Sequence, residues 1–372
     1  MVSRSRWVAL LALLGCDQAR APDPVSDRSD VLAACDPEPM IEDAVQCALP
    51  DTQEPFAETS IDPQLGLAGN PALRSVDALV RGGPDLLIAA GAYGDTAPDG
   101  AWLVAIGPDA TRAWSATVAG PSDAVTIRAA GDADGVWIAV ARADGDTLAR
   151  HYDLLGMSLG ELIVPDFAVE SLQLQPLGAI AMSGTSGGNP SYVGVATDGA
   201  ELWNGNTNDA EGLYVIAGGD IQYFDGPGAS VWDFDPRGTP DAGFPIDVGA
   251  ERAIITSTGD VLAVGTSLGP LGDNAQIVRL DDGGRLTWSL GLPRVHPETV
   301  LEGLMDTTII AGQSFHCSAG TYIGVFDEVG GLIQDVRVAA PPSPWAVAVD
   351  NNLASVGIDA DALTLRTFEV ES

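Results

Sequence analysis

Lysine is missing from this chain: all 17 basic residues are arginine, against 52 aspartates and glutamates. Chemistry that needs a side-chain amine, such as Schiff-base catalysis or the phosphate-binding lysine of P-loop proteins and kinases, is therefore excluded. The formal net charge of -35 repels phosphate backbones and anionic lipid headgroups. The sequence thus predicts no nucleic-acid partner and no electrostatic docking to a membrane.

Histidine is almost as rare, with three copies. No pair among them has the spacing of zinc ligands, and the chain holds no CxxC motif. Each is therefore expected to have a structural role; they are His151, His296 and His316. With so few groups for acid–base or metal chemistry, we predict no catalytic residue, no metal-ligand set and no cofactor site.

The chain begins with an apolar segment that is too short to cross a bilayer. Two arginines precede the run Trp7–Leu14, which has eight residues, whereas a transmembrane helix needs about 20. The sequence Leu-Leu-Gly-Cys that ends at Cys16 resembles the lipobox of bacterial lipoproteins. This resemblance implies that residues 1–15 are a signal peptide and that Cys16 is acylated; a plain secretory signal is the alternative.

A lipid anchor predicts attachment to the cell envelope. Each buried methylene of an acyl chain contributes roughly 0.8 kcal/mol, so several chains hold a protein durably. Asp17 resembles the inner-membrane retention signal of enteric bacteria, a rule that other lineages do not follow. Asp17 therefore leaves the choice of membrane open; the outer membrane or the cell surface is expected in preference to the inner membrane, with the lipid as the only membrane contact.

Residues 16–55 are rich in aspartate, proline, alanine and glutamate and are expected to form an acidic, disordered tether. Because the envelope is oxidising, Cys35 and Cys47 are expected to form a disulfide within it. Cys317 is then left as a small buried residue, and its pairing with Cys35 or Cys47 is the alternative.

The rest of the chain repeats a short pattern. One element is a β-rich run that ends at glycine, seen in Leu87–Gly91, Ala179–Gly184, Val261–Gly265, Ile309–Gly312 and Leu353–Gly357. A second element is a strand, a turn built on aspartate and another strand that often carries tryptophan. Its turn aspartates are separated by 44, 45, 37, 47 and 45 residues; they are Asp109, Asp153, Asp198, Asp235, Asp282 and Asp327.

A period near 45 residues is typical of a β-propeller blade with four short strands. One such sheet cannot bury both faces alone, whereas radial stacking buries each face against the next sheet. Residues 56–372 are therefore predicted to form an all-β propeller of about seven blades, with six or eight as alternatives. The predicted blades begin near Ser75, Ala124, Ala168, Leu213, Ala253, Val300 and Pro344.

The last repeat has room for only three strands. Because an open ring would leave a sheet edge exposed, Phe56–Ile61 is expected to pair there as the missing outer strand.

Segments such as Leu103–Trp114 and Val193–Trp203 resemble the repeats of PQQ-like β-propellers. That group includes outer-membrane lipoproteins that serve as assembly scaffolds in β-barrel insertion. True quinoprotein dehydrogenases carry a metal-ligand set, a cofactor-stacking tryptophan and often a vicinal disulfide. No adjacent cysteines occur in this chain, so the resemblance implies the fold and not the quinoprotein cofactor.

Two kinds of motif imitate functional sites. Gly184–Gly188 and Gly265–Gly269 match the G-x-S-x-G pattern of serine hydrolases, but both fall at the same point of different repeats and are expected to be turns. Three acidic segments present oxygen donors at alternate positions, as calcium loops do, without completing an EF-hand: Asp132–Gly135, Asn204–Asp209 and Asp359–Asp361. Hydrated turns are expected there, with calcium as the alternative.

These observations predict a binding or scaffolding module of the cell envelope, not an enzyme, whose partner is an envelope protein or polysaccharide. Recognition is expected at one end of the ring, where Thr185–Pro190, Asn204–Ala210 and Gly269–Asn274 converge. One alternative is a quinoprotein-like oxidoreductase or hydrolase, which carboxylates with raised pKa values at the ring axis would favour. Another is a calcium-dependent surface adhesin, which a melting temperature unchanged by EDTA would rule out.

Overall fold

The computed structural model places residues 49–372 in one compact unit. It describes residues 52–66, 72–94, 98–118, 124–131, 133–174, 179–206, 212–217, 220–225, 230–234, 240–245, 249–256, 258–269, 272–281, 285–293, 295–303, 306–314, 321–338, 344–347, 352–359 and 362–369. The predicted signal peptide, most of the tether, the lipidation site Cys16, the predicted pair Cys35 and Cys47, and Cys317 lie outside these residues. Within these ranges, no helix has the length and apolar character needed to cross a membrane.

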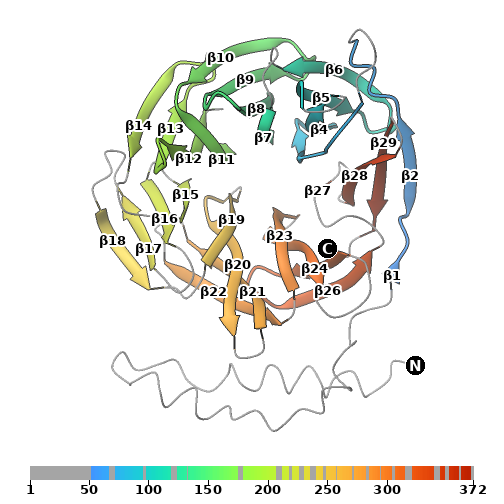
Figure 1. The fold of residues 1–372 in the computed structure, drawn as a ribbon. Coiled ribbons are helices and arrows are strands. Elements are labelled where there is room, and N and C mark those ends of the chain that lie inside the picture. Colours follow the sequence, from blue (N-terminus) through green and yellow to red (C-terminus); the bar gives the residue numbers. More distant parts are fainter. Residues whose placement is uncertain are drawn as a thin grey trace, which may run out of the picture. The chain divides into compact units, whose positions relative to one another are not determined.

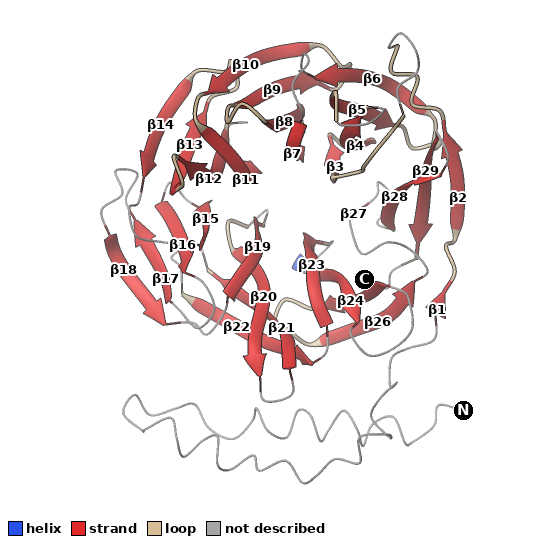
Figure 2. Cartoon of the chain, in the orientation of Figure 1, coloured by secondary structure: helices blue, strands red, loops and turns tan. Residues whose placement is uncertain are grey.

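The described strands form seven sheets (Figures 1 and 2). Sheet 1 holds β3 to β6 (Ala78–Gly82, Leu86–Tyr93, Gly100–Ile106, Arg112–Val118), sheet 2 holds β7 to β10 (Ala124–Gly131, Gly135–Arg142, Thr147–Asp153, Ser158–Val164) and sheet 3 holds β11 to β14 (Phe167–Leu174, Ile180–Ser186, Asn189–Val195, Glu201–Asn206). Sheet 4 holds β15 to β18 (Gly212–Ala217, Asp220–Asp225, Ser230–Phe234, Pro240–Pro245) and sheet 5 holds β19 to β22 (Gly249–Ile255, Val261–Gly269, Gly272–Leu280, Leu286–Pro293). Sheet 6 holds β23 to β26 (Val295–Glu302, Thr308–Ser314, Thr321–Phe326, Leu332–Val338) with β1 (Thr52–Gln53), and sheet 7 holds β27 to β29 (Trp345–Val347, Leu353–Asp359, Ala362–Phe368) with β2 (Ala57–Ile61).

The sheets follow one another around a closed ring. The first strands of successive sheets contact one another in order, namely β3, β7, β11, β15, β19, β23 and β27, and β27 contacts β3 again. In Figure 2 these strands surround the centre, while β2, β6, β10, β14, β18, β22 and β26 form the rim. The predicted all-β propeller is therefore confirmed, and the seven predicted blade starts lie in or within three residues of these inner strands.

Hydrophobic burial between neighbouring sheets explains the radial stacking. One apolar cluster joins sheet 1 to sheet 2 through residues such as Ile88, Leu103 and Ile138, all of which are fully buried. Fully burying one such side chain stabilises the folded state by roughly 1.5–3 kcal/mol. Other clusters join sheets 2 and 3, 5 and 6, 6 and 7, and 7 and 1. Second and third strands such as β4, β5 and β8 are almost entirely buried because both of their faces are covered.

The ring is closed by a strand from the N-terminal part of the chain, as predicted. β2 pairs antiparallel with β29, from Ala57 opposite Thr367 to Ile61 opposite Leu363. The Phe56 N–H donates to the Thr367 carbonyl at 2.7 Å, and Ile61 is buried in the cluster between sheets 7 and 1. The open edge of the last sheet is thereby covered.

The tether prediction is wrong at its C-terminal end. Thr52 and Gln53 form β1, which pairs in parallel with Arg337 and Val338 at the outer edge of sheet 6. Residues 52–53 are only two positions long, so no periodic pattern could reveal them as a strand. The backbone hydrogen bonds of the outer edge of β26 decide their conformation.

The predicted aspartate turns join the third and fourth strands of the sheets. Asp153 Oδ1 accepts hydrogen bonds from the N–H groups of Leu155 and Met157, and Asp327 Oδ1 does the same for Val329 and Gly331. In sheet 5 the equivalent residue is Asp281, which accepts from the Arg285 N–H, rather than the predicted Asp282. Asp282 and Asp235 lie outside the described residues.

Tryptophans on outermost strands dock onto these turns in the next sheet. Trp114 of sheet 1 donates its indole N–H to the Leu154 carbonyl of sheet 2 at 2.9 Å. Trp288 of sheet 5 donates to the Glu328 carbonyl of sheet 6, also at 2.9 Å. The glycine beneath each ring has positive φ, 83° at Gly156 and 82° at Gly330, so the same device joins two pairs of sheets.

Candidate binding site in the central channel

The strand order assigns each connecting segment to one end of the ring. The innermost strands all run in the same direction, because the four main strands of each sheet are antiparallel and the fourth leads to the next innermost strand. We call the end where the innermost strands begin the upper end, and the opposite end the lower end. Turns between second and third strands lie at the upper end, whereas turns between third and fourth strands lie at the lower end.

The three predicted recognition segments belong to the upper end. Thr185–Pro190 forms the hairpin between β12 and β13, and Gly269–Asn274 spans the end of β20 and the start of β21. Asn204–Ala210 begins in β14 and leads toward β15, and its last four residues lie outside the described part of the chain. The topology therefore brings all three to the same end, as expected.

Neither hydrolase-like motif forms a nucleophile elbow. Ser186 ends β12, and Gly187 and Gly188 make a two-residue hairpin turn with φ of 57° and 82°. Ser267 lies inside β20, paired with Asn274 of β21. An elbow requires a strand followed by a helix, and a strand follows here in both cases. The predicted turn is found at Gly187 and Gly188, whereas the turn prediction for Gly265–Gly269 is wrong, because these residues belong to β20.

A cavity of about 630 Å³ occupies the lower part of the channel. Its described walls are mostly apolar and come from six innermost strands and nearby turns, including Leu79, Leu172, Ala253, Ile254, Leu301 and Ala346. Arg81, Glu302 and Asp306 add polar groups toward the lower end. We call this space the lower chamber.

A second cavity of about 230 Å³ lies nearer the upper end. Five charged residues line it, each from a different innermost strand or the residue just before it: Asp77, Arg128, Glu170, Arg252 and Glu298. Along β3, β7 and β11 the charge alternates in sign, and it differs again between β19 and β23. We call this space the charged mouth.

Strand irregularities help to place these charges. Glu170 is an extra residue in the pairing of β11 with β12, and Glu298 is an extra residue in the pairing of β23 with β24. Such bulges leave one residue outside the ladder and redirect its backbone and side chain. Both lie next to a partner glycine, Gly184 or Gly312, where a Cβ would collide with the opposite backbone.

Arg128 is held in a defined position within the charged mouth. Its Nε donates to the Glu170 carbonyl at 2.7 Å, and its Nη1 donates to the Ile127 carbonyl at 2.9 Å. Burial lowers the pKa of the Arg128 guanidinium, and the nearby positive charge of Arg252 lowers it further, while Asp77 and Glu170 act in the opposite direction. Two guanidinium groups therefore share this region of the channel.

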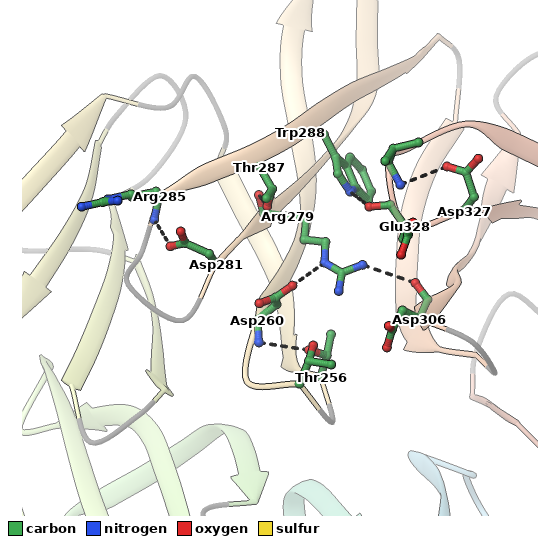
Figure 3. Close-up of polar contacts among 12 residues, drawn as sticks. Thr256, Asp260, Arg279, Asp281, Arg285, Thr287, Trp288, Asp306, Asp327 and Glu328 are labelled. Atoms are coloured by element: carbon green, nitrogen blue, oxygen red, sulfur yellow. Dashed lines mark hydrogen bonds and ion pairs between the residues drawn. The ribbon is translucent and has the colours of Figure 1, made fainter.

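An ion pair within sheet 5, whose arginine also contacts sheet 6, lies near the lower chamber (Figure 3). Arg279 is 5% exposed; its Nε donates to Asp260 at 2.7 Å and its Nη1 to the Asp306 carbonyl at 3.3 Å. Asp306 has a φ of 59° and lines the lower chamber. Loss of one partner of a buried pair is strongly destabilising, so Arg279 has a structural role.

The histidines have structural surroundings where they are described. His151 is 3% exposed, and its ring stacks on Trp137 with centroids 4.6 Å apart and an interplanar angle of 5°. Its Nδ1 lies 3.3 Å from the Thr197 carbonyl. His296 is half-buried in β23, and His316 lies outside the described residues. His151 therefore fits the predicted structural role.

The described residues contain no group of three or more histidines, cysteines, aspartates or glutamates that could hold a metal ion. The candidate calcium segments are only partly covered: residues 132, 207–209 and 360–361 lie outside the described ranges. The calcium alternative is therefore untested at those positions.

Sequence reasoning did not find the charged mouth. Arg128 and Arg252 sit in short apolar strands, and no motif marks them as partners 124 residues apart. The available signal was a charged residue within several innermost strands. Only the ring geometry shows that these positions face one channel.

Comparison with known proteins identifies the fold alone. No protein-family model matches the chain, and no curated protein matches it. A streptogramin B lyase structure is 9% identical, with a TM-score of 0.56, over 84% of this chain and 98% of that chain. A catalytically inactive virginiamycin B lyase of Staphylococcus aureus with quinupristin is 10% identical, with a TM-score of 0.55, over 84% and 99%. BamB of Moraxella catarrhalis is 12% identical, with a TM-score of 0.44, over 84% of this chain and 99% of that chain.

Proposed function

We propose that this protein is a lipid-anchored β-propeller that binds or scaffolds an envelope protein or polysaccharide and performs no catalysis. The observation that carries the proposal is the closed ring, whose upper end gathers the three non-repeating segments and the charged mouth. The lipobox-like sequence at Cys16 supports its location at the envelope. The resemblance of the repeats to PQQ-like lipoprotein scaffolds supports the same role.

Each of the seven sheets is one blade in this proposal, and the upper end is the recognition face. Loops carried on a rigid scaffold are common binding sites, because the scaffold holds them in place while their sequences vary. The hydrolase alternative has lost its motif support, since Ser186 and Ser267 lie in hairpins. At 9–10% identity, the lyase names carry no reaction over to this chain.

Site-specific crosslinking in native cells tests the recognition face. A photoreactive residue at Asn189, in the upper-end hairpin, is expected to capture an envelope component. The same residue at Leu155, which is 76% exposed in a lower-end turn, is the matched control and is expected to capture little. Equal capture from both positions, or capture from neither, would contradict the proposed face.

The anchor is tested separately. Substitution Cys16→Ala is expected to abolish incorporation of labelled fatty acid and to move the protein from the membrane fraction to the soluble fraction. Retained labelling in the variant would show that a residue other than Cys16 carries the lipid.

A further inference from the structure

The two cavities of the channel adjoin one another among the described residues. Seven residues line both of them: Leu79, Val80, Ala129, Leu172, Ala253, Ile254 and Leu301. The space therefore changes along the ring axis from charged walls at the mouth to apolar walls in the lower chamber. A ligand that fits both parts must have a charged end and an apolar end.

Arg128 offers a prepared site for a carboxylate. Both hydrogen bonds that it makes within the described chain go to carbonyl oxygens, so the guanidinium is fixed in place without a hydrogen bond to a carboxylate. Guanidinium groups bind carboxylates through parallel N–H bonds, and Nη2 and the second Nη1 hydrogen of Arg128 remain for this purpose. Arg252 places a second positive charge in the same cavity.

The neighbouring acidic groups favour a ligand that also carries a positive charge. Asp77 accepts a hydrogen bond from the Ser75 hydroxyl at 2.6 Å and forms no ion pair with a described residue. Glu170 has no ion pair in the described chain either. With three carboxylates at the mouth and a net charge of -35, the site opposes the entry of a multiply charged anion.

We propose that the channel binds a free α-amino acid with an apolar side chain. Its carboxylate contacts Arg128, its ammonium group lies among Asp77 and Glu170, and its side chain extends into the lower chamber. Such a ligand is neutral overall, so the acidic protein does not repel it. This small-ligand site goes beyond the proposed recognition of an envelope partner and stands or falls independently of it.

Calorimetric titration of the full chain with leucine tests the site. Saturable binding is expected, and Arg128→Gln is expected to weaken it by about 10- to 100-fold, because a charge-assisted hydrogen bond is lost. Arg285→Gln, in an exposed lower-end turn, is the matched control and is expected to bind leucine as the unchanged protein does. Glu170→Gln, which keeps its main-chain carbonyl for Arg128, is expected to weaken binding to a smaller extent.

The chemical class is tested with analogues on the unchanged protein. N-acetyl-leucine lacks the ammonium charge and leucine amide lacks the carboxylate, so both are expected to bind at least about tenfold more weakly than leucine. Absence of saturable leucine binding up to about 10 mM would overturn the proposal. Equal leucine binding by the unchanged protein and by an Arg128→Gln variant with a native melting temperature would overturn it too. Binding of both analogues as tightly as leucine would also overturn it.

Discussion

Two kinds of junction hold neighbouring sheets together, and they are built differently. Between sheets 1 and 2, and between sheets 5 and 6, a rim tryptophan docks onto the next aspartate turn. Between sheets 7 and 1 the N-terminal segment makes the rim contacts instead. Arg112 donates to the side chain of Gln64 at 2.6 Å, and the Ser115 hydroxyl donates to the Gln64 carbonyl at 3.0 Å. No tryptophan takes part in these contacts.

The difference distinguishes contacts that each repeat can form with the next one from the contacts that close the ring. A tryptophan junction needs two elements about one repeat apart, such as Trp114 and Leu154, and copies of it arise whenever the repeat is copied. Closure of the chain lies within sheet 7, where β2 and β29 bring together residues such as Glu58 and Arg366, which are 308 positions apart. Its chain entropy cost is larger, and its failure opens the whole ring.

Removal of the closing strand is expected to have the largest effect. A chain that starts at residue 62 loses the β2 ladder and the burial of Ile61, which together stabilise the fold by about 4 kcal/mol or more. It also exposes the β29 edge to intermolecular pairing. Thermal unfolding and size-exclusion chromatography, with a chain that starts at Leu49 as control, measure this. A monodisperse protein with an unchanged melting temperature would show that closure is dispensable.

A methyl group added to the glycine beneath the tryptophan ring is expected to have a smaller effect on stability. A Cβ at Gly156 would lie 2.9 Å from the Trp114 ring, whereas at Gly145 it would meet nothing within 4 Å. Both glycines have positive φ, so Gly156→Ala and Gly145→Ala share a backbone strain of about 1–2 kcal/mol. Gly156→Ala is expected to cost about 1–3 kcal/mol more, because the ring is displaced. Denaturant unfolding of both variants checks the difference, and equal losses would show that the docked ring contributes little.

The smallest expected effect is that of low pH on the stability that the Asp109 turn of sheet 1 contributes. Hydrogen bonds from the Thr111 side chain and main chain lower the pKa of Asp109. A carboxyl group with a lowered pKa in the folded state contributes stability above its unfolded pKa, and this contribution is lost as the pH falls through the folded pKa. The melting temperature of Asp109→Asn is therefore expected to fall slightly less than that of the unchanged protein between about pH 6 and pH 3. Parallel curves would contradict this role.

The propeller was predictable because its rules are local. The apolar runs ending at Gly91, Gly184 and Gly312 and the spacing of the turn aspartates follow from strand length and turn chemistry. The missing strand in the last repeat even indicated Phe56–Ile61 as the closing segment.

Features that depend on long-range geometry were not predictable. Thr52–Gln53 is ordered by the outer edge of β26, and nothing in its own two residues signals a strand. Asp281 and Asp282 are adjacent acids, and only the hydrogen bond from Arg285 identifies the first as the turn residue. Arg128 and Arg252 approach one another only because the inner strands converge on one axis.

The position of β2 has a consequence for biosynthesis. The strand that completes the last sheet is made before the seven innermost strands, whereas its partner β29 is the last strand of the ring to be made. Domains that fold during synthesis do so from the N-terminus onward, but in this ring β2 stays unpaired until β29 has been synthesised. The ring therefore closes only after β29 has been made. A chain that is halted earlier remains an open arc with two sheet edges whose unpaired backbone groups can bind other chains.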